Sequence, residues 1–117
     1  MSGINQLTYP CQKVFDAKSA TGVYWVLPEH LEGLSLEWTV YVTFSHTSDS
    51  GGLSFESAPF RNYQGTWALI GSAIAWSAID KCHMLNFTGL LQSARLRLST
   101  TVTTGSMDVY VMAANKT

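Results

Sequence analysis

The residues that could bind a metal ion are few and lie far apart in the sequence. His30, His46 and His83 fall in three different segments, and neither the CxxC nor the HExxH spacing of a zinc site occurs. Cys82 adjoins His83, but neighbouring residues on a strand point to opposite faces, so the two are poor co-ligands. We therefore expect no metal site.

The spacings typical of catalytic and nucleotide-binding sites are also missing. The sequence contains no GxSxG nucleophile elbow, no GxxxxGK[ST] loop and no GxGxxG turn. Glu29 and Glu32 are three residues apart and could share one face of a helical turn, as a pair of glycosidase carboxylates would. A solvated turn accounts for the same pair, and we favour it. We expect no enzyme activity and no cofactor.

Aromatic residues are the stronger functional signal, and several fall in a loop. The segment 57–65 reads as a loop and holds Phe60, Arg61 and Tyr63, with Trp67 just beyond it. Loops seldom bury their residues, so these side chains are candidates for an interface. An exposed aromatic cluster can anchor a protein partner, or it can stack on sugar rings. Core packing is the simpler explanation for Trp25, Trp38 and Trp76.

Arg95 and Arg97 alternate with Leu96 and Leu98, so they should point to the same side of a strand. A side chain pair of this kind could form a salt bridge with Glu37 or Asp108, contact another subunit, or be solvated. We include both arginines among the candidate interface residues.

The composition limits the classes of protein that are compatible with this chain. Its 117 residues suit one domain, and charged residues make up 13%, about half of the usual ~25%. A surface of hydroxyl, small and aromatic side chains costs little to desolvate, which favours contact with other proteins. The net charge of −1 and the lack of a basic stripe argue against nucleic-acid binding.

Membrane insertion and secretion are not indicated either. No apolar run reaches the ~18–20 residues that span a bilayer, and Met1–Gln6 has neither the basic nor the apolar part of a secretory signal. Without such a signal, we expect the only two cysteines, Cys11 and Cys82, to be reduced thiols, although a bridge between them stays open.

One long strand must position these side chains. From Leu34 to Ser45 every even position up to Phe44 is apolar, and the odd positions are mostly polar, with Tyr41 the one aromatic among them. This period of two predicts a strand with one buried face that crosses the middle of a sheet.

Shorter strands should surround it, joined by loops and turns. We expect a loose arm over residues 1–6, a single domain over 7–117, and a helical turn over 28–33 closed by Gly33. The other expected strands are 7–15 (interrupted at Pro10), 23–27, 53–56, 66–70, 72–79, 82–87, 94–102 and 107–113. About eight short strands with turns between them predict an all-β antiparallel sandwich of jelly-roll or Greek-key type.

Four phrases in the second half carry a family resemblance. They are Ser54-Phe-Glu-Ser57 with Gly65-Thr-Trp-Ala-Leu-Ile-Gly-Ser72, then Leu85-Asn-Phe-Thr-Gly89, Ala94-Arg-Leu-Arg-Leu-Ser99 and Thr104-Gly-Ser-Met-Asp-Val-Tyr-Val111. In order and style they resemble tailed-phage virion proteins. In size they are similar to the jelly-roll decoration, or cement, proteins that brace the capsids of short-tailed phages. The resemblance spans residues 34–113.

This resemblance implies a non-enzymatic role on the outer capsid surface of a virion, for a protein made in the host cytoplasm. The implied partners are major capsid protein subunits and further copies of the same chain. The contacts would involve the arm, with Ile4, and the loops 46–52 and 57–65. The candidate interface residues are Ile4, Phe60, Arg61, Tyr63, Trp67, Arg95 and Arg97. The alternative is a carbohydrate-binding or adhesion module of a tail fibre or baseplate.

Overall fold

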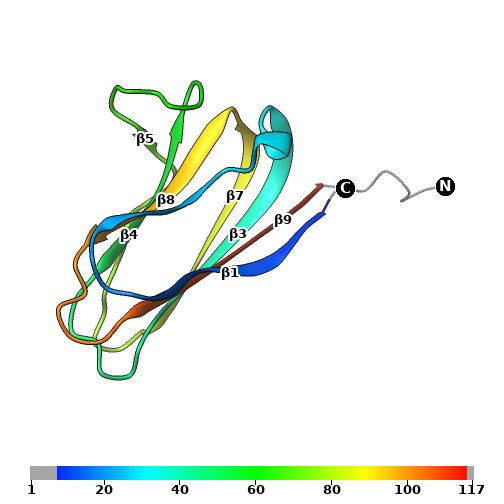
Figure 1. Cartoon of the computed structure of the whole chain (residues 1–117). Helices are drawn as coiled ribbons and strands as arrows, with labels where there is room; N and C mark the ends of the chain where they lie inside the picture. The colour runs from blue at the N-terminus through cyan, green and yellow to red at the C-terminus, as the bar shows by residue number, and fades with distance from the viewer. Residues whose placement is uncertain (1–7, 116–117) are drawn as a thin grey trace.

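A computed structural model describes residues 8–115 of the chain (Figure 1). Within these residues the chain forms nine strands and one short 3-10 helix. They are β1 (Thr8–Lys18), β2 (Gly22–Val26), η1 (Glu29–Leu31), β3 (Leu34–Phe44), β4 (Gly52–Ala58), β5 (Ala68–Leu69), β6 (Ile74–Ala75), β7 (Cys82–Leu91), β8 (Ser93–Thr100) and β9 (Met107–Asn115). The arm 1–6, including Ile4, lies outside the described residues.

The strands form two antiparallel sheets that pack face to face, which confirms the predicted all-β sandwich. One sheet has the order β1-β9-β3-β7. The other has the order β2-β8-β4-β5, with β6 also beside β4. No helix within residues 8–115 is long and apolar enough to cross a membrane.

Strand β3 lies in the interior of its sheet, as its alternating sequence predicts. It pairs without a register shift with β7 on one side and with β9 on the other. The apolar side chains at its even positions from Leu36 to Phe44 are buried, whereas Leu34 at its start is 37% exposed. The long alternating run therefore specifies both the sheet and the face that the core covers.

An aromatic cluster fills one part of the core between the two sheets. The ring of Trp38 lies 5.8 Å from that of Trp25 and 6.4 Å from that of Phe55, measured between ring centroids. Tyr9 joins the cluster from β1, and its hydroxyl accepts a hydrogen bond from Trp25 Nε1 at 3.2 Å. Rings at these distances add packing energy beyond the area that they bury.

The first strand is longer than predicted. It continues past Phe15 to Lys18, through residues that the sequence marks as a turn. Ala17 adopts a positive φ of 52°, and its N–H donates to Asp108 Oδ1 at 2.7 Å. The partner carboxylate on β9 therefore stabilises the irregular end of β1. The expected interruption at Pro10 is present as the first of three register shifts against β9.

Three other strand boundaries also differ from prediction. The expected strands 66–70 and 72–79 shrink to the two-residue strands β5 and β6, on either side of Gly71 at φ 67°. Strand β7 continues through Thr88 and Gly89 to Leu91, beyond the expected end at residue 87, where the separate expected strands 82–87 and 94–102 required a turn. The ring of Phe87 lies where a side chain at residue 89 would be, so this glycine makes room for the ring rather than for a turn.

Two smaller predictions hold. The segment after Pro28 forms a 3-10 turn, and Gly33 follows it at φ 77°. Cys11 and Cys82 are both exposed and free, on β1 and β7 at opposite edges of one sheet. A bridge between them does not form.

Candidate binding site

The loop between β4 and β5, residues 59–67, folds over the outer face of the five-stranded sheet. Glu56 pairs with Leu69 and Ser57 with Ala68, so the loop closes a hairpin. Asn62 takes a positive φ of 64°, and this reverses the chain within the loop. In Figure 1 the loop stands at one end of the sandwich, next to the start of β5. We call this segment the 59–67 loop.

Arg61 ties this loop to the connection between β2 and β3. Its Nη2 atom lies 2.6 Å from Glu32 Oε2 and donates a hydrogen bond to the carbonyl oxygen of Leu27 at 3.0 Å. Both partners belong to segments far from the loop in sequence. The guanidinium of Arg61 is thus a structural tether as well as a partly exposed surface group.

The aromatic residues of the loop pack on one another. Tyr63 and Phe60 meet edge to face, with ring centroids 5.2 Å apart, and the indole N–H of Trp67 donates to the carbonyl oxygen of Tyr63 at 3.1 Å. Phe60 remains 57% exposed despite this contact. The loop therefore presents an apolar ring on a backbone held by internal contacts.

A ladder of charged side chains supports the loop from below. The guanidinium of Arg95 stacks on the ring of Trp67, 4.2 Å from its centroid. Arg95 Nε donates to Glu56 Oε1 at 2.7 Å, and Arg97 Nε donates to Glu56 Oε2 at 3.0 Å. The predicted partners Glu37 and Asp108 are wrong because they lie on β3 and β9, in the other sheet.

Glu56 keeps its negative charge in this environment. Burial raises the pKa of the Glu56 carboxyl, but the hydrogen bonds and positive charges of Arg97 and Arg95 outweigh burial, and the pKa falls below its ordinary value. A carboxylate bound by two arginines is a poor proton donor, so this ladder supports the loop rather than acid–base chemistry.

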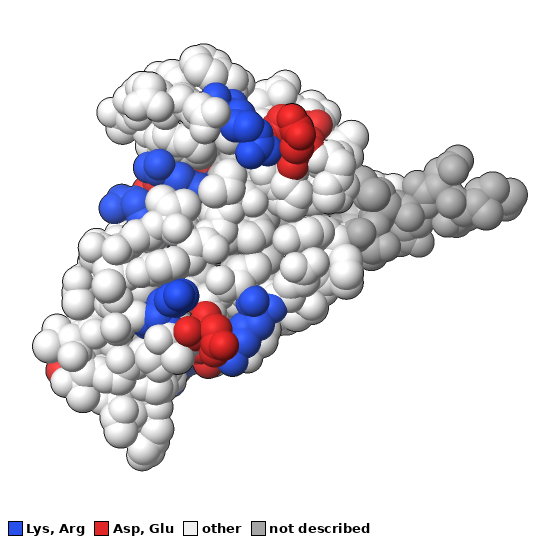
Figure 2. Space-filling view, viewed as in Figure 1, with Lys and Arg blue, Asp and Glu red and all other residues white. Residues whose placement is uncertain are grey.

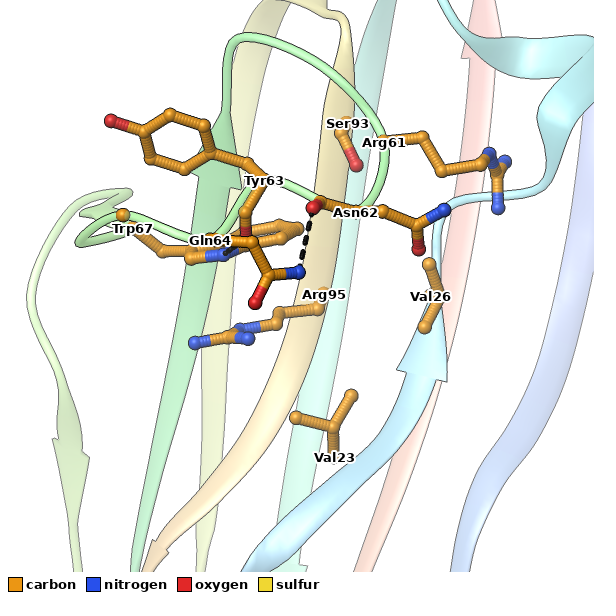
Figure 3. A pocket seen from close by; sticks show the side chains of 10 residues that line it. Val23, Val26, Arg61, Asn62, Tyr63, Gln64, Trp67, Ser93 and Arg95 are labelled. Atoms are coloured by element: carbon orange, nitrogen blue, oxygen red, sulfur yellow. Dashed lines mark hydrogen bonds between the residues drawn. The ribbon is translucent and has the colours of Figure 1, made fainter.

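A groove of about 530 Å³ lies between the 59–67 loop, β2 and β8 (Figure 3). Val23 and Val26 form its apolar wall, and the ring of Tyr63 points away from them. Its lining residues are Val23, Val26, Arg61, Asn62, Tyr63, Gln64, Gly65, Trp67, Ser93 and Arg95. The hydroxyl of Ser93 is buried beneath the groove and has no hydrogen-bond partner among the described residues. The groove suits an uncharged polar group or a peptide backbone.

The structure brings most of the predicted interface residues together. Phe60, Arg61, Tyr63 and Trp67 belong to the 59–67 loop, and Arg95 lies beneath it. Arg97 lies two residues further along β8, on the same face, and also binds Glu56. Ile4 lies outside the described residues.

Glu56 and Ser93 were missed by sequence reasoning. The signal for Glu56 was present, because it alternates with Leu53 and Phe55 and must therefore point away from the core. Its pairing with Arg95 depends on β4 lying beside β8, which the sequence does not state.

The surface is poor in charge, and about half of the charged residues form ion pairs. Figure 2 shows a mostly uncharged face on which basic and acidic side chains gather in small mixed groups. Lys13 lies 3.3 Å from Asp16 and 3.7 Å from Asp108, which makes a second such group on the four-stranded sheet. Within residues 8–115, no three His, Cys, Asp or Glu residues are grouped so that they could hold a metal ion.

Comparison with known proteins adds no assignment. No family model, curated protein or solved structure matches this chain.

Proposed function

We propose that this chain is a non-enzymatic capsid decoration protein, which binds the outer shell of a virus particle and stabilises it. The capsid part of the proposal is supported by the resemblance of residues 34–113. The binding part is supported by one structural observation, the anchored 59–67 loop with Phe60 exposed on it. A partner that binds only the assembled shell stabilises assembly by mass action.

The loop has the properties expected of a protein-binding anchor. Because Arg61 and Trp67 already fix its backbone, little conformational entropy is lost when a partner binds. An exposed aromatic ring at a rigid position is the usual centre of an interface.

The two loops that the resemblance implies as contacts lie at opposite ends of β4. The expected loop 46–52 lies at the start of this strand and the 59–67 loop follows its end, so a contact confined to one end of the sandwich involves only one of the two. The described part of β1 begins at the end that carries the 59–67 loop, since Thr8 pairs with Ala114 and Asn115 pairs with Leu36 near the start of β3. We infer that this end faces the shell.

We also infer that the sandwich is a jelly roll. If β5 and β6 count as one interrupted strand beside β4, each sheet has four strands. Every connection except that from β4 to β5 and β6 then passes from one sheet to the other. Two four-stranded sheets joined in this way are typical of the jelly roll.

Particle composition tests the proposed function. We expect purified particles from the source of this chain to hold it at a copy number comparable to that of the major shell subunit. The Phe60→Ala variant should bind depleted particles roughly tenfold more weakly, as the loss of a central aromatic anchor does. Quantitative gel densitometry of purified particles measures the copy number, and a sedimentation assay with labelled protein measures the binding.

Ile79→Ala provides the matched control, because Ile79 is 89% exposed and precedes β7, away from the 59–67 loop. Its binding should equal that of the unaltered chain. A few copies per particle would indicate the tail instead, and absence from particles would refute both virion roles.

The second candidate function is carbohydrate binding, as in an adhesion module. The observation that favours it is the groove, which combines Trp67 with the amides of Asn62 and Gln64. Against it, Arg95 already covers one face of Trp67, and Tyr63 contacts Phe60, so few ring faces are open to a sugar.

Titration with host-surface glycans tests this candidate. If the groove binds a glycan, the tryptophan fluorescence should shift on binding, and the variant Gln64→Ala, which removes one of the amides that line the groove, should reduce that shift. A chain whose fluorescence no glycan alters would eliminate the carbohydrate function and leave the decoration proposal unaffected.

A further inference from the structure

Strand β7 is an edge of the four-stranded sheet and lacks the features that usually protect an edge. Its ten residues, Cys82–Leu91, include no charged residue and no proline, and they pair with β3 without a bulge. Within residues 8–115, β3 is the only strand beside it. A long, regular, uncharged edge is a template for another strand.

The remaining sheet edges differ from β7 in this respect. The opposite edge, β1, has Pro10, several charged side chains and three register shifts. In the other sheet, β2 has five residues and a shift, and β5 and β6 have two residues each. Bulges, charges, proline and short length all discourage pairing with another chain. Among the edges that the structure describes, β7 alone therefore lacks features that discourage pairing with another chain.

The hydrogen-bond pattern shows which backbone groups of β7 are available. The N–H of Phe44 donates to the carbonyl of Lys81 at 2.8 Å, and these two residues continue the register of β3 with β7. Hydrogen-bonded pairs alternate along an antiparallel ladder, so the odd residues of β7 bond to β3. The even residues, from Cys82 to Leu90, direct their N–H and C=O groups to the open edge.

We propose that a second copy of this chain pairs with this edge, β7 against β7, across a two-fold axis at Asn86. A two-fold axis makes the two strands antiparallel. Centring the pair on Asn86 places Met84 opposite the Thr88 position and Cys82 opposite the Leu90 position of the other copy. This register joins all the outward-directed residues, and the two four-stranded sheets become one continuous sheet.

The side chains of β7 favour a second copy as the occupant. In a two-fold pair the residue on the axis faces its own copy, so a charge there would meet a like charge, and the neutral sequence of β7 avoids that repulsion. Met84 and Leu90 are 57% and 55% exposed on the outer face. On the inner face, Leu85 and Phe87 pack against the core but are only partly buried, and a partner strand would cover them.

Sedimentation velocity of the purified chain over a concentration series tests this pairing without any shell protein. We expect a concentration-dependent dimer. The double variant Met84→Lys with Thr88→Lys sets like charges opposite each other twice, and should weaken the dimer about tenfold or more. The charge-swapped variant Met84→Glu with Thr88→Lys sets opposite charges together in the same register, and should dimerise like the unaltered chain.

Each alternative outcome overturns the proposal. An unaltered chain that stays monomeric refutes the pairing, as does a lysine double variant that dimerises normally. A charge-swapped variant that is as monomeric as the lysine variant refutes the register at Asn86. Circular dichroism confirms that each variant is folded. Should the lysine double variant unfold, Asn86→Lys decides, because Asn86 is exposed and one substitution on the axis sets two lysines opposite each other, which should weaken the dimer. Particle binding is not measured, so failure here leaves the proposed function to its own test.

Discussion

Replacing Trp38 with alanine should lower the free energy of unfolding by about 3–5 kcal/mol, the usual cost of removing a large buried ring. Trp38 is 1% exposed and lies at the centre of the aromatic cluster, next to Trp25, Phe55 and Tyr9. It also lies on β3, which two strands flank. The cavity would thus open between both sheets. Since a domain is stable by only about 5–15 kcal/mol, the variant should be marginally folded.

Trp38→Phe provides the control for this loss. The indole N–H of Trp38 is buried and has no hydrogen-bond partner among residues 8–115, and an unsatisfied buried donor costs about 1–3 kcal/mol. Phenylalanine fills most of the space and removes that donor, so the loss should be much smaller than for alanine. Urea unfolding followed by circular dichroism measures both. A loss below about 1 kcal/mol for Trp38→Ala would contradict the packing described here.

Glu56→Ala is expected to have the second largest effect, a loss of about 2 kcal/mol in the free energy of unfolding. Removing one partner of a fully buried ion pair costs about 3–5 kcal/mol, because the other charge is left uncompensated. The side chain of Glu56 is 8% exposed, but those of Arg95 and Arg97 are 27% and 40% exposed, so water would partly solvate them. The 59–67 loop should loosen as well, since Arg95 supports Trp67.

The same carboxylate predicts a dependence of stability on pH. The pKa of Glu56 in the folded protein lies below its ordinary value of 4.5. The ionised Glu56 side chain therefore contributes its full stabilisation of the folded state above pH 4.5, and this stabilisation is lost as the pH falls through the folded pKa. Thermal unfolding of the unaltered chain and of Glu56→Gln should differ most at neutral pH, and the two should converge as the pH falls below 4.5 and through the lowered pKa of folded Glu56. A constant difference across that range would contradict the assignment.

The pKa of Asp49 is also lowered, chiefly by the backbone N–H of Thr104. The titration of Asp49 does not affect the comparison of the two proteins. Asp49 is present in both proteins, so its loss of charge at low pH cancels in the difference between them.

The strands with a clear alternation were predictable from sequence, and the irregular ones were not. The period of two in β3 is confirmed because one of its faces is buried along nearly the whole strand. Strands β5 and β6 were overestimated because most residues of the two expected strands are exposed at the edge of the sheet, where Leu69 is 49% exposed. Burial, rather than composition, decides how far a strand extends.

The candidate site was predictable as a set of residues but not as a groove. Loop composition identified Phe60 and Tyr63, and strand phase placed Arg95 on an outer face. The groove itself depends on contacts between distant segments, such as Arg61 with Leu27 and Arg95 with Glu56. These pairs depend on the order of the strands in the sheet, and no local sequence pattern encodes that order.

The pairing of β1 with β9 has a consequence for the order in which the molecule is made. Residue 8 lies beside residue 114, so the first described strand cannot pair until the last one has been synthesised. Ribosomes add roughly 5–20 residues per second, so the delay is on the order of ten seconds. During that time β3 also lacks its partner strand β9, although all the residues of its apolar face have already been synthesised. The nascent chain can therefore complete this sheet only after β9 has been synthesised, and chaperones that shield β3 in the interval would raise its yield.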